Sequence, residues 1–306
     1  MTNDDSSRTS RLRPVLSRAE HAAGVQRGDL VERAGYLIQP GCRLSQIVSG
    51  RPPGITTHQW SVATRAQLDF VVCDGDGYHP VFAVDFVDPG GRTAHQQRDE
   101  RMTDAVCAAL GLELLRIESA VLAPAGPGRR IVEYVLDARR FQEAGRQPGQ
   151  EPAAETPEAI SVISYRDIIG RLPDGRTGYV NDLGAVARAR AVDAFVGRQL
   201  VDPLLRGLHA SWRDGSAEGW AWLAVRENLF LFERVRIWPH RLQCGIEPGR
   251  FVEDLAAAAI GERLKGLELG EPNLRERDAL SRELHLLRSR RAEMAGEFAF
   301  EHVSFG

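Results

Sequence analysis

Two aspartates in the first half of the chain have the spacing of a paired-carboxylate site. Asp69 lies in the apolar run LDFVVC, Asp85 lies in the apolar run PVFAVDFV, and the turn-forming sequence DGDGYH separates the runs. If the runs form a hairpin that turns at Gly77, residues whose numbers add up to 154 face each other. Asp69 and Asp85 are such a pair, and their Cβ atoms would lie about 5 Å apart on one face of the sheet.

Two carboxylates at that distance repel each other and destabilise the sheet unless something compensates the charge. A divalent cation with oxygen ligands is the simplest compensation, and Mg²⁺ commonly binds through one or two carboxylates plus substrate phosphates. We therefore expect Mg²⁺ or Mn²⁺ at Asp69 and Asp85. The alternative is a register shifted by one residue, which would turn one aspartate to solvent and leave no site.

The elements that must position this hairpin are predicted on both sides of it. Before it, Ser17–Ala34 has helix signals, with Ser17 as N-cap and Glu20 completing a capping box, and the loop 49–57 follows. After it, the pattern predicts a helix over about 95–110, ended by Gly111. The face of this helix that we expect to be buried contains Met102, Ala105, Val106, Ala109 and Leu110. A strand over 112–117 and a last helix over about 130–143 complete the unit.

Taken in order, these segments resemble a known enzyme group. The helix with Glu20, the strands with Asp69 and Asp85, and the run HQQRDERMTDAVCAALGLELLRI that begins at His95 occur in the same order in that group. The chain from about 12 to 145 thereby resembles the very-short-patch-repair-endonuclease-like branch of the PD-(D/E)xK restriction-endonuclease superfamily. The resemblance implies a restriction-endonuclease-like fold, with a central mixed sheet flanked by helices, and a metal-dependent nuclease that acts on DNA.

The resemblance also assigns roles to single residues. Asp69 matches the motif aspartate, Asp85 matches the (D/E) position, and Glu20 matches the glutamate of the family's N-terminal helix. The lysine position two residues after Asp85 is Val87, which is chemically inert. Some relatives carry the lysine on the following helix, where this chain has Gln97, Arg98 and Arg101. Arginine can stabilise phosphate charge but cannot act as a base, because it stays protonated.

The departures leave two functions open. One is a Mg²⁺-dependent endonuclease with weakened catalysis, in which Arg98 supplies positive charge. The other is a catalytically inactive nuclease-fold protein, used for nucleic-acid binding or as a regulatory or protein-interaction module. The chain has a single lysine, Lys265, so no lysine in the first half can serve the site.

The remaining candidate residues each have a structural alternative. His95, Arg98 and Arg101 are candidates for DNA contact, whereas a histidine near a helix start is more often structural and Arg98 can pair with a neighbouring aspartate. Glu20 can be a third acidic ligand or only part of the capping box. Arg116 matches an arginine of the family, and its role can be purely structural.

Composition and charge place the chain among globular proteins. Apolar residues make up 43% and charged residues 26%, no apolar run reaches the length of a membrane span, and the N-terminus has no signal-peptide core. The four scattered cysteines predict neither a zinc site nor disulfides, and the net charge of −3 excludes a strongly basic nucleic-acid coat. We expect a soluble, cytoplasmic protein without membrane contact, whose oligomeric state the sequence does not indicate.

The second half is predicted to be a separate α+β domain of unknown fold and role, with a possible protein partner. We expect residues 1–11 to be a disordered tail, 12–145 the nuclease-like domain, 146–159 a linker and 160–306 the C-terminal domain. The second-half elements are a helix over about 183–208, an aromatic-rich strand segment over 220–238, and helices over about 250–266 and 273–293. The tryptophans interleaved with arginines in 212–238 fit either a core or a base-stacking surface.

The proposed linker gives the first testable prediction. Residues 146–159 are rich in Pro, Glu and Gln and have almost nothing to bury, so limited proteolysis should cut there first and release two resistant fragments. Mass spectrometry of the early fragments checks this. Resistance of that stretch, together with a single melting transition reported by probes in both halves, would contradict the two-domain interpretation.

Overall fold

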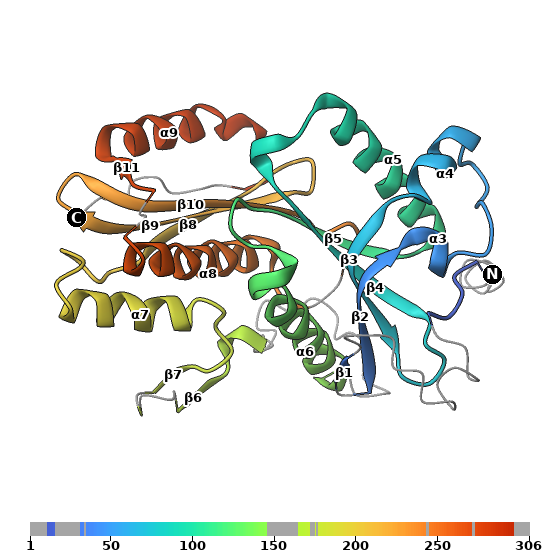
Figure 1. The fold of residues 1–306 in the computed structure, drawn as a ribbon, viewed down its shortest axis with the longest axis horizontal. Coiled ribbons are helices and arrows are strands. Elements are labelled where there is room, and N and C mark those ends of the chain that lie inside the picture. Colours follow the sequence, from blue (N-terminus) through green and yellow to red (C-terminus); the bar gives the residue numbers. More distant parts are fainter. Residues whose placement is uncertain are drawn as a thin grey trace, which may run out of the picture. The chain divides into compact units, whose positions relative to one another are not determined.

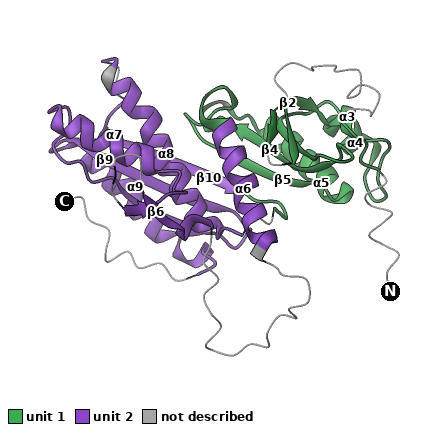
Figure 2. Cartoon of the chain, turned by 90° about the horizontal axis from the view of Figure 1, so that it is seen from below, with its two compact units in different colours: residues 1–128, 238–242 green, residues 129–237, 243–306 purple. Residues whose placement is uncertain are grey.

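The computed structural model describes residues 11–15, 31–33, 35–145, 165–171, 175, 177–242, 245–270 and 273–296. The chain forms two compact units, coloured separately in Figure 2. The first unit comprises residues 1–128 together with 238–242, and the second comprises 129–237 and 243–306. The helix predicted over 130–143 is thus assigned to the second unit, and a short piece of the second half to the first. The proposed linker lies outside the described residues and stays a prediction.

A mixed sheet forms the centre of the first unit (Figure 1). Its strands follow in the order β1 (Val31–Arg33), β2 (Tyr36–Arg43), β3 (Gln67–Asp74), β4 (Pro80–Val87) and β5 (Glu113–Glu118). β1 to β4 are antiparallel to their neighbours, whereas β4 and β5 are parallel. The sheet is therefore mixed, as the predicted central mixed sheet would be.

The parallel pair β4 and β5 needs a crossover connection, which α5 (Ala94–Leu110) provides. Thr93 caps its N-terminus in a capping box with Gln96, and Gly111 ends it in the left-handed conformation at φ 75°. Two shorter helices belong to the same unit, α3 (Leu44–Ile47) and α4 (Thr57–Ala63), and α4 packs against α5. Short helical turns also occur at Pro89–Gly91 and Pro124–Gly128.

The core of the first unit joins the sheet to α5. Leu68 and Val71 of β3 are buried in one cluster with Val106 and Leu110 of α5. The buried face of α5 was largely predicted: Met102, Val106 and Leu110 are buried, while Ala105 and Ala109 are only half-buried. Thr103 and Cys107 complete that face. The same side of α5 lines the cleft nearer its N-terminus, where Asp99, Glu100 and the buried Thr103 are among the lining residues.

The second unit contains an antiparallel sheet in the order β10 (Leu229–Trp238), β9 (Ala217–Arg226), β8 (Arg206–Ser211), and β11 (Arg275–Glu276) pairs with β10. Its helices are α6 (Arg129–Gly145), α7 (Ala185–Val196), α8 (Pro248–Glu268) and α9 (Arg277–Ser289). A small hairpin, β6 (Ile169–Arg171) and β7 (Thr177–Tyr179), and short turns at Tyr165–Asp167 and Arg291–Glu293 complete it.

The helices of the second unit form layers on its sheet (Figure 1). α9 covers one face through a buried cluster that includes Trp220, Trp222 and Leu284. α8 covers the other face at Gly219, where a Cβ atom would lie 2.2 Å from the carbonyl oxygen of Val252, so only glycine fits. α7 packs on the outer side of α8.

Several predicted elements need correction. The helix predicted over 17–34 does not extend to its end, because Val31–Arg33 is strand β1; residues 16–30 lie outside the described part. The helix predicted over 183–208 ends at Val196, and residues 206–208 belong to β8. Trp212, Trp220 and Trp222 are buried, so the core interpretation of these aromatics is right and a base-stacking surface built on them is wrong. Within the described residues, no helix has both the length and the apolar character needed to cross a membrane.

Candidate functional site

The β3–β4 hairpin has the predicted register. Phe70 pairs with Val84, Val71 with Ala83 and Val72 with Phe82, and each pair adds up to 154. A bulge next to the turn shifts only the pairing of Cys73, which meets Pro80. One step further along the same ladder, the carboxyl groups of Asp69 and Asp85 are hydrogen-bonded to each other. The two aspartates are therefore neighbours, as the residue numbers predicted.

The charge of this carboxyl pair is controlled by burial and by two donors. Asp69 Oδ2 accepts the backbone N–H of Phe86 at 2.7 Å, and Asp85 Oδ2 accepts Nη1 of Arg116 at 2.7 Å. Burial raises the pKa of Asp85 to about 7; the Arg116 guanidinium opposes this shift, and the charge of Asp69 adds to it. Burial likewise raises the pKa of Asp69 despite its backbone hydrogen bond. Burial and the neighbouring charge thus favour a proton held between the two carboxyl groups near neutral pH.

Arg116 supplies the positive charge nearest to the pair. It lies directly opposite Asp85 in the β4–β5 ladder, and its second arm, Nη2, donates to Asp104 of α5 at 2.7 Å. Its side chain is only 5% exposed. A buried guanidinium with two carboxylate partners binds both in fixed geometry. The residue that sequence reasoning left as structural therefore contacts the candidate ligand Asp85 itself.

A cleft of about 760 Å³ opens beside Asp85. Its walls come from the start of β3, the end of β4 and the adjoining side of α5. The lining side chains that matter for chemistry are Asp85, Val87, Arg65, Arg92, His95, Glu100 and Arg116. The structure thus brings Val87, at the missing-lysine position, to the same cleft as the carboxylate.

Of the other predicted site residues, some line the cleft and some do not. His95 lines it, but its side chain is 81% exposed and lies 3.3 Å from Asp99. Arg98 and Arg101 are exposed on α5 and are not among the lining residues. Glu20 lies outside the described residues, so its predicted role as a ligand stays a prediction.

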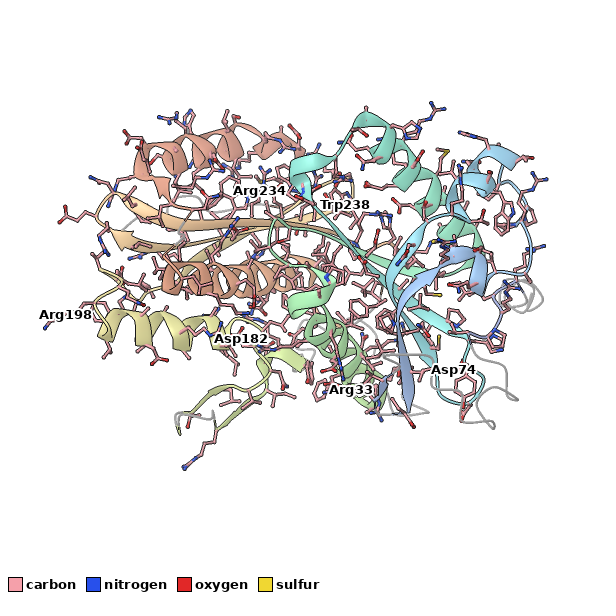
Figure 3. The ribbon with its side chains drawn as sticks, viewed as in Figure 1. Arg33, Asp74, Asp182, Arg198, Arg234 and Trp238 are labelled. Atoms are coloured by element: carbon pink, nitrogen blue, oxygen red, sulfur yellow. The ribbon has the colours of Figure 1, made fainter. Side chains whose placement is uncertain are left out.

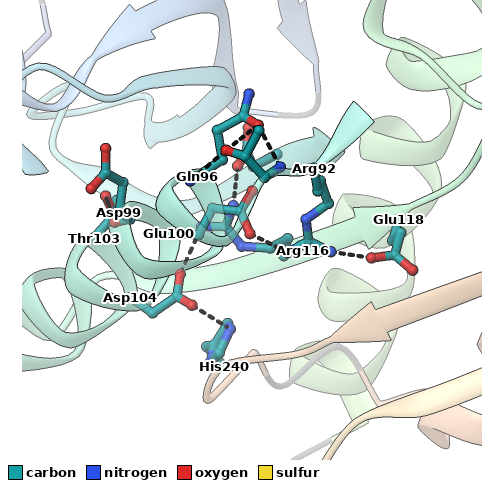
Figure 4. A network of polar contacts seen from close by, with 11 residues as sticks. Arg92, Gln96, Asp99, Glu100, Thr103, Asp104, Arg116, Glu118 and His240 are labelled. Carbon is teal, nitrogen blue, oxygen red and sulfur yellow. Dashed lines mark hydrogen bonds and ion pairs between the residues drawn. The ribbon is translucent and has the colours of Figure 1, made fainter. Parts of the chain in front are cut away.

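Sequence reasoning missed a second ion-pair network in the cleft, which Figure 4 shows. Arg92 pairs with Glu100 of α5 and with Glu118 at the end of β5. Asp104, which binds Arg116, also lies 3.4 Å from Nε2 of His240. The spacing of Gln96, Glu100 and Asp104 at every fourth residue was the available signal, since such residues share one face of a helix. Nothing local indicated His240.

The carboxyl pair fits a divalent cation in one respect. The two carboxyl groups lie side by side, and a cation between them would neutralise the charge of both. Mg²⁺ needs only one or two protein carboxylates when waters and substrate phosphate complete its shell. Among the described residues no group of three His, Cys, Asp or Glu side chains has the geometry of a metal site. The metal-ligand role predicted for Asp69 and Asp85 therefore stays a prediction.

Comparison with known proteins adds one finding. A family model described as "Protein of unknown function (DUF2726)" matches residues 13–125. This range contains the whole β3–β4–α5–β5 arrangement with Asp69, Asp85 and Arg116, and it ends before residues 238–242. No curated protein and no solved structure gave a significant match. The resemblance to the restriction-endonuclease superfamily stays a prediction.

The shared proton predicts how stability depends on pH. Because folding raises the pKa of Asp85 from 3.8 to about 7, the native state holds a proton that the unfolded chain releases between these values. The free energy of unfolding should therefore fall as the pH rises from about 4 to about 7. In Asp69→Asn the amide oxygen can still accept from Phe86 and the amide NH₂ can donate to Asp85, so the repulsion disappears. The variant should be more stable than the wild type by on the order of 1 kcal/mol at pH 8 and similar to it near pH 4.

Thermal melts between pH 4 and 9 measure this effect. Asp88→Asn is the matched control, because Asp88 lines the same cleft but caps a turn, a role that asparagine also fills. If Asp69→Asn and Asp88→Asn give the same pH profile as the wild type, the shared-proton pair is wrong.

Proposed function

We propose that the first unit is a metal-dependent, nuclease-like domain that acts on phosphodiester bonds of DNA, with Asp69 and Asp85 as ligands of Mg²⁺ or Mn²⁺. The observation that carries this proposal is the hydrogen-bonded carboxyl pair, of which Asp85 lines an open cleft while Asp69 is not among the lining residues. The order of the site segments, which resembles the very-short-patch-repair-endonuclease-like branch of the PD-(D/E)xK superfamily, supports it. A mixed sheet with a helical crossover between β4 and β5 is compatible with that fold.

The arginines around the cleft support a phosphate ligand. Arg65, Arg92 and Arg116 line it, and guanidinium groups match phosphate oxygens in charge and shape. The Nε atoms of Arg92 and Arg116 are buried and have no hydrogen-bond acceptor within the described part of the chain. Buried donors of this kind are normally satisfied, so an acceptor brought by a ligand is a direct explanation.

Each residue has a definite part in the proposed chemistry. The backbone N–H of Phe86 orients Asp69, and Arg116 orients Asp85 while neutralising part of its charge. A bound Mg²⁺ ion supplies Lewis acidity and lowers the pKa of water, which reduces the need for a protein base. None of the cleft arginines can serve as that base, because arginine stays protonated. Slow hydrolysis follows, since no lysine assists it.

DNA contact outside the cleft is assigned to the exposed side of α5. Arg98 and Arg101 are exposed there, and His95 stands at the cleft border. Contacts of exposed arginines with the phosphate backbone position a duplex without reading its sequence. A transition-state role for Arg98 has less support than the positioning role, because Arg98 does not line the cleft. A protein partner of the C-terminal half stays a prediction.

A second candidate function is supported by Val87 and Arg116. Val87 provides no proton-transfer group, and Arg116 already holds one oxygen of Asp85. A nuclease fold with such a site can serve as a DNA-binding or regulatory module that does not cut. The two candidates differ in one measurable property, metal-dependent cleavage.

The cleavage assay separates these functions. Purified protein should slowly degrade plasmid or single-stranded DNA with Mg²⁺ or Mn²⁺, and Asp85→Asn should reduce the rate by about 100-fold or more, since it weakens the metal site. Asp88→Asn should leave the rate unchanged. DNA binding without cleavage by the wild type under every metal condition would instead establish the non-catalytic function.

The missing lysine gives a gain-of-function prediction. Residue 87 lies two positions after Asp85 on the same strand, about 7 Å along it, and lines the same cleft. Val87→Lys should therefore raise metal-dependent cleavage above the wild-type rate, whereas Val87→Met, which has similar length and no charge, should not. Equal rates in the two variants would show that position 87 does not reach the reacting phosphate.

A further inference from the structure

A five-residue segment, Trp238–Leu242, belongs to the first unit, although the residues before and after it in the sequence belong to the second. It follows directly on β10, whose strand ends at Trp238. Its contacts nevertheless group it with residues 1–128. Figure 3 shows the side chain of Trp238 at the end of β10.

One backbone hydrogen bond and one side-chain hydrogen bond attach this segment. The carbonyl oxygen of His240 accepts the N–H of Leu114 at 3.2 Å, which ties the segment to β5. Arg241 Nη1 donates to the carbonyl oxygen of Ala108 near the end of α5 at 3.4 Å. The segment thereby joins the two elements that hold Arg116 and Asp104.

Two side chains of the segment reach the ion-pair networks of the cleft. The guanidinium of Arg92 lies 5.7 Å from the centre of the Trp238 ring, which is a cation–π distance. Nε2 of His240 lies 3.4 Å from Asp104 Oδ2, which is longer than a good hydrogen bond, and burial lowers the pKa of His240, so the ring faces this carboxylate in its neutral form. Arg92 lines the cleft, and Asp104 holds Arg116, which in turn holds Asp85.

We propose that Trp238 and His240 are positioning residues of the Asp69–Asp85 site. Trp238 fixes the guanidinium plane of Arg92 at the cleft wall, while Glu100 and Glu118 fix its direction. His240 fixes the carboxylate of Asp104, and through it the guanidinium that orients Asp85. The site built by residues 13–125 is thus completed by a piece of chain that lies more than a hundred residues after β5. The coupling stands on the contacts alone; only its effect on cleavage rests on the proposed function.

The coupling can be tested without metal or DNA. His240 and Asp85 belong to one chain of contacts with Asp104 and Arg116 as intermediates, so a double-mutant cycle on the full chain should reveal non-additivity. The unfolding equilibrium constant of His240→Ala/Asp85→Asn should depart from the product of the single effects by a factor of about 3 or more, because the contacts run from His240 through Asp104 and Arg116 to Asp85. The cycle with Asp88→Asn in place of Asp85→Asn should be additive.

His240→Gln, which keeps a side-chain donor toward Asp104, replaces His240→Ala in the cycle if the alanine variant does not fold. Additivity in the Asp85 cycle, or equal non-additivity in the Asp88 cycle, would overturn the proposal. Because these measurements are made on the metal-free protein, they do not depend on whether it cuts DNA.

A second readout connects the segment to the cleft. Under the proposed function, Trp238→Ala should raise KM for DNA several-fold with a smaller change in kcat. The reason is that the guanidinium of Arg92, which lines the cleft, loses the ring that orients it. Trp238→Phe retains a ring face and should restore most of the affinity. If both variants lower kcat and raise KM to the same extent, Trp238 has a merely structural role and its part in the proposal is overturned. If the wild type does not cleave DNA at all, that result counts against the proposed function alone.

Discussion

The structure of the first unit depends on the confinement of two carboxyl groups next to each other on neighbouring strands. Asp69 and Asp85 share a hydrogen bond, and burial raises the pKa of both. This arrangement is tolerable because β5 lies parallel to β4 and places Arg116 opposite Asp85. Removing the Arg116 guanidinium would cost about 3–5 kcal/mol, since it would leave the charge of its carboxylate partners uncompensated. The β4–α5–β5 crossover is therefore what makes the carboxyl pair possible.

The helix of that crossover serves the core and the site together. One side of α5 contributes Met102, Val106 and Leu110 to the buried face, while Glu100 and Asp104 bind the two cleft arginines. The two sets interleave along the helix because its period of 3.6 residues separates them. A rotation of α5 would expose the first set and detach the second, so apolar packing fixes the ion pairs in place.

The sequence predicted the local parts of this arrangement and missed the non-local ones. The register of Asp69 and Asp85 followed from residue numbers because one short turn fixes a hairpin, and even the bulge at Cys73 left the outer pairs unchanged. The partners of Arg116 were not predictable, since a parallel register depends on how the crossover helix packs. The contact of Trp238 with Arg92 has no local signal at all. The helix predicted over 183–208 was too long. The residues after Gly197 have a composition typical of helices, but the helix ends at Val196 with Gly197 as its C-cap.

The ion pairs also decide what the cleft can attract. Arg116 is bound by Asp85 and Asp104, and Arg92 by Glu100 and Glu118, so each of the two guanidinium groups has two acidic partners that offset its charge. Without a cation, the cleft therefore offers a phosphate little net attraction beyond the exposed Arg65. A cation at Asp69 and Asp85 would displace their shared proton and add the positive charge that the networks do not provide. Under the proposed function, metal and phosphate would therefore bind this cleft cooperatively, because each would supply the charge that the other lacks.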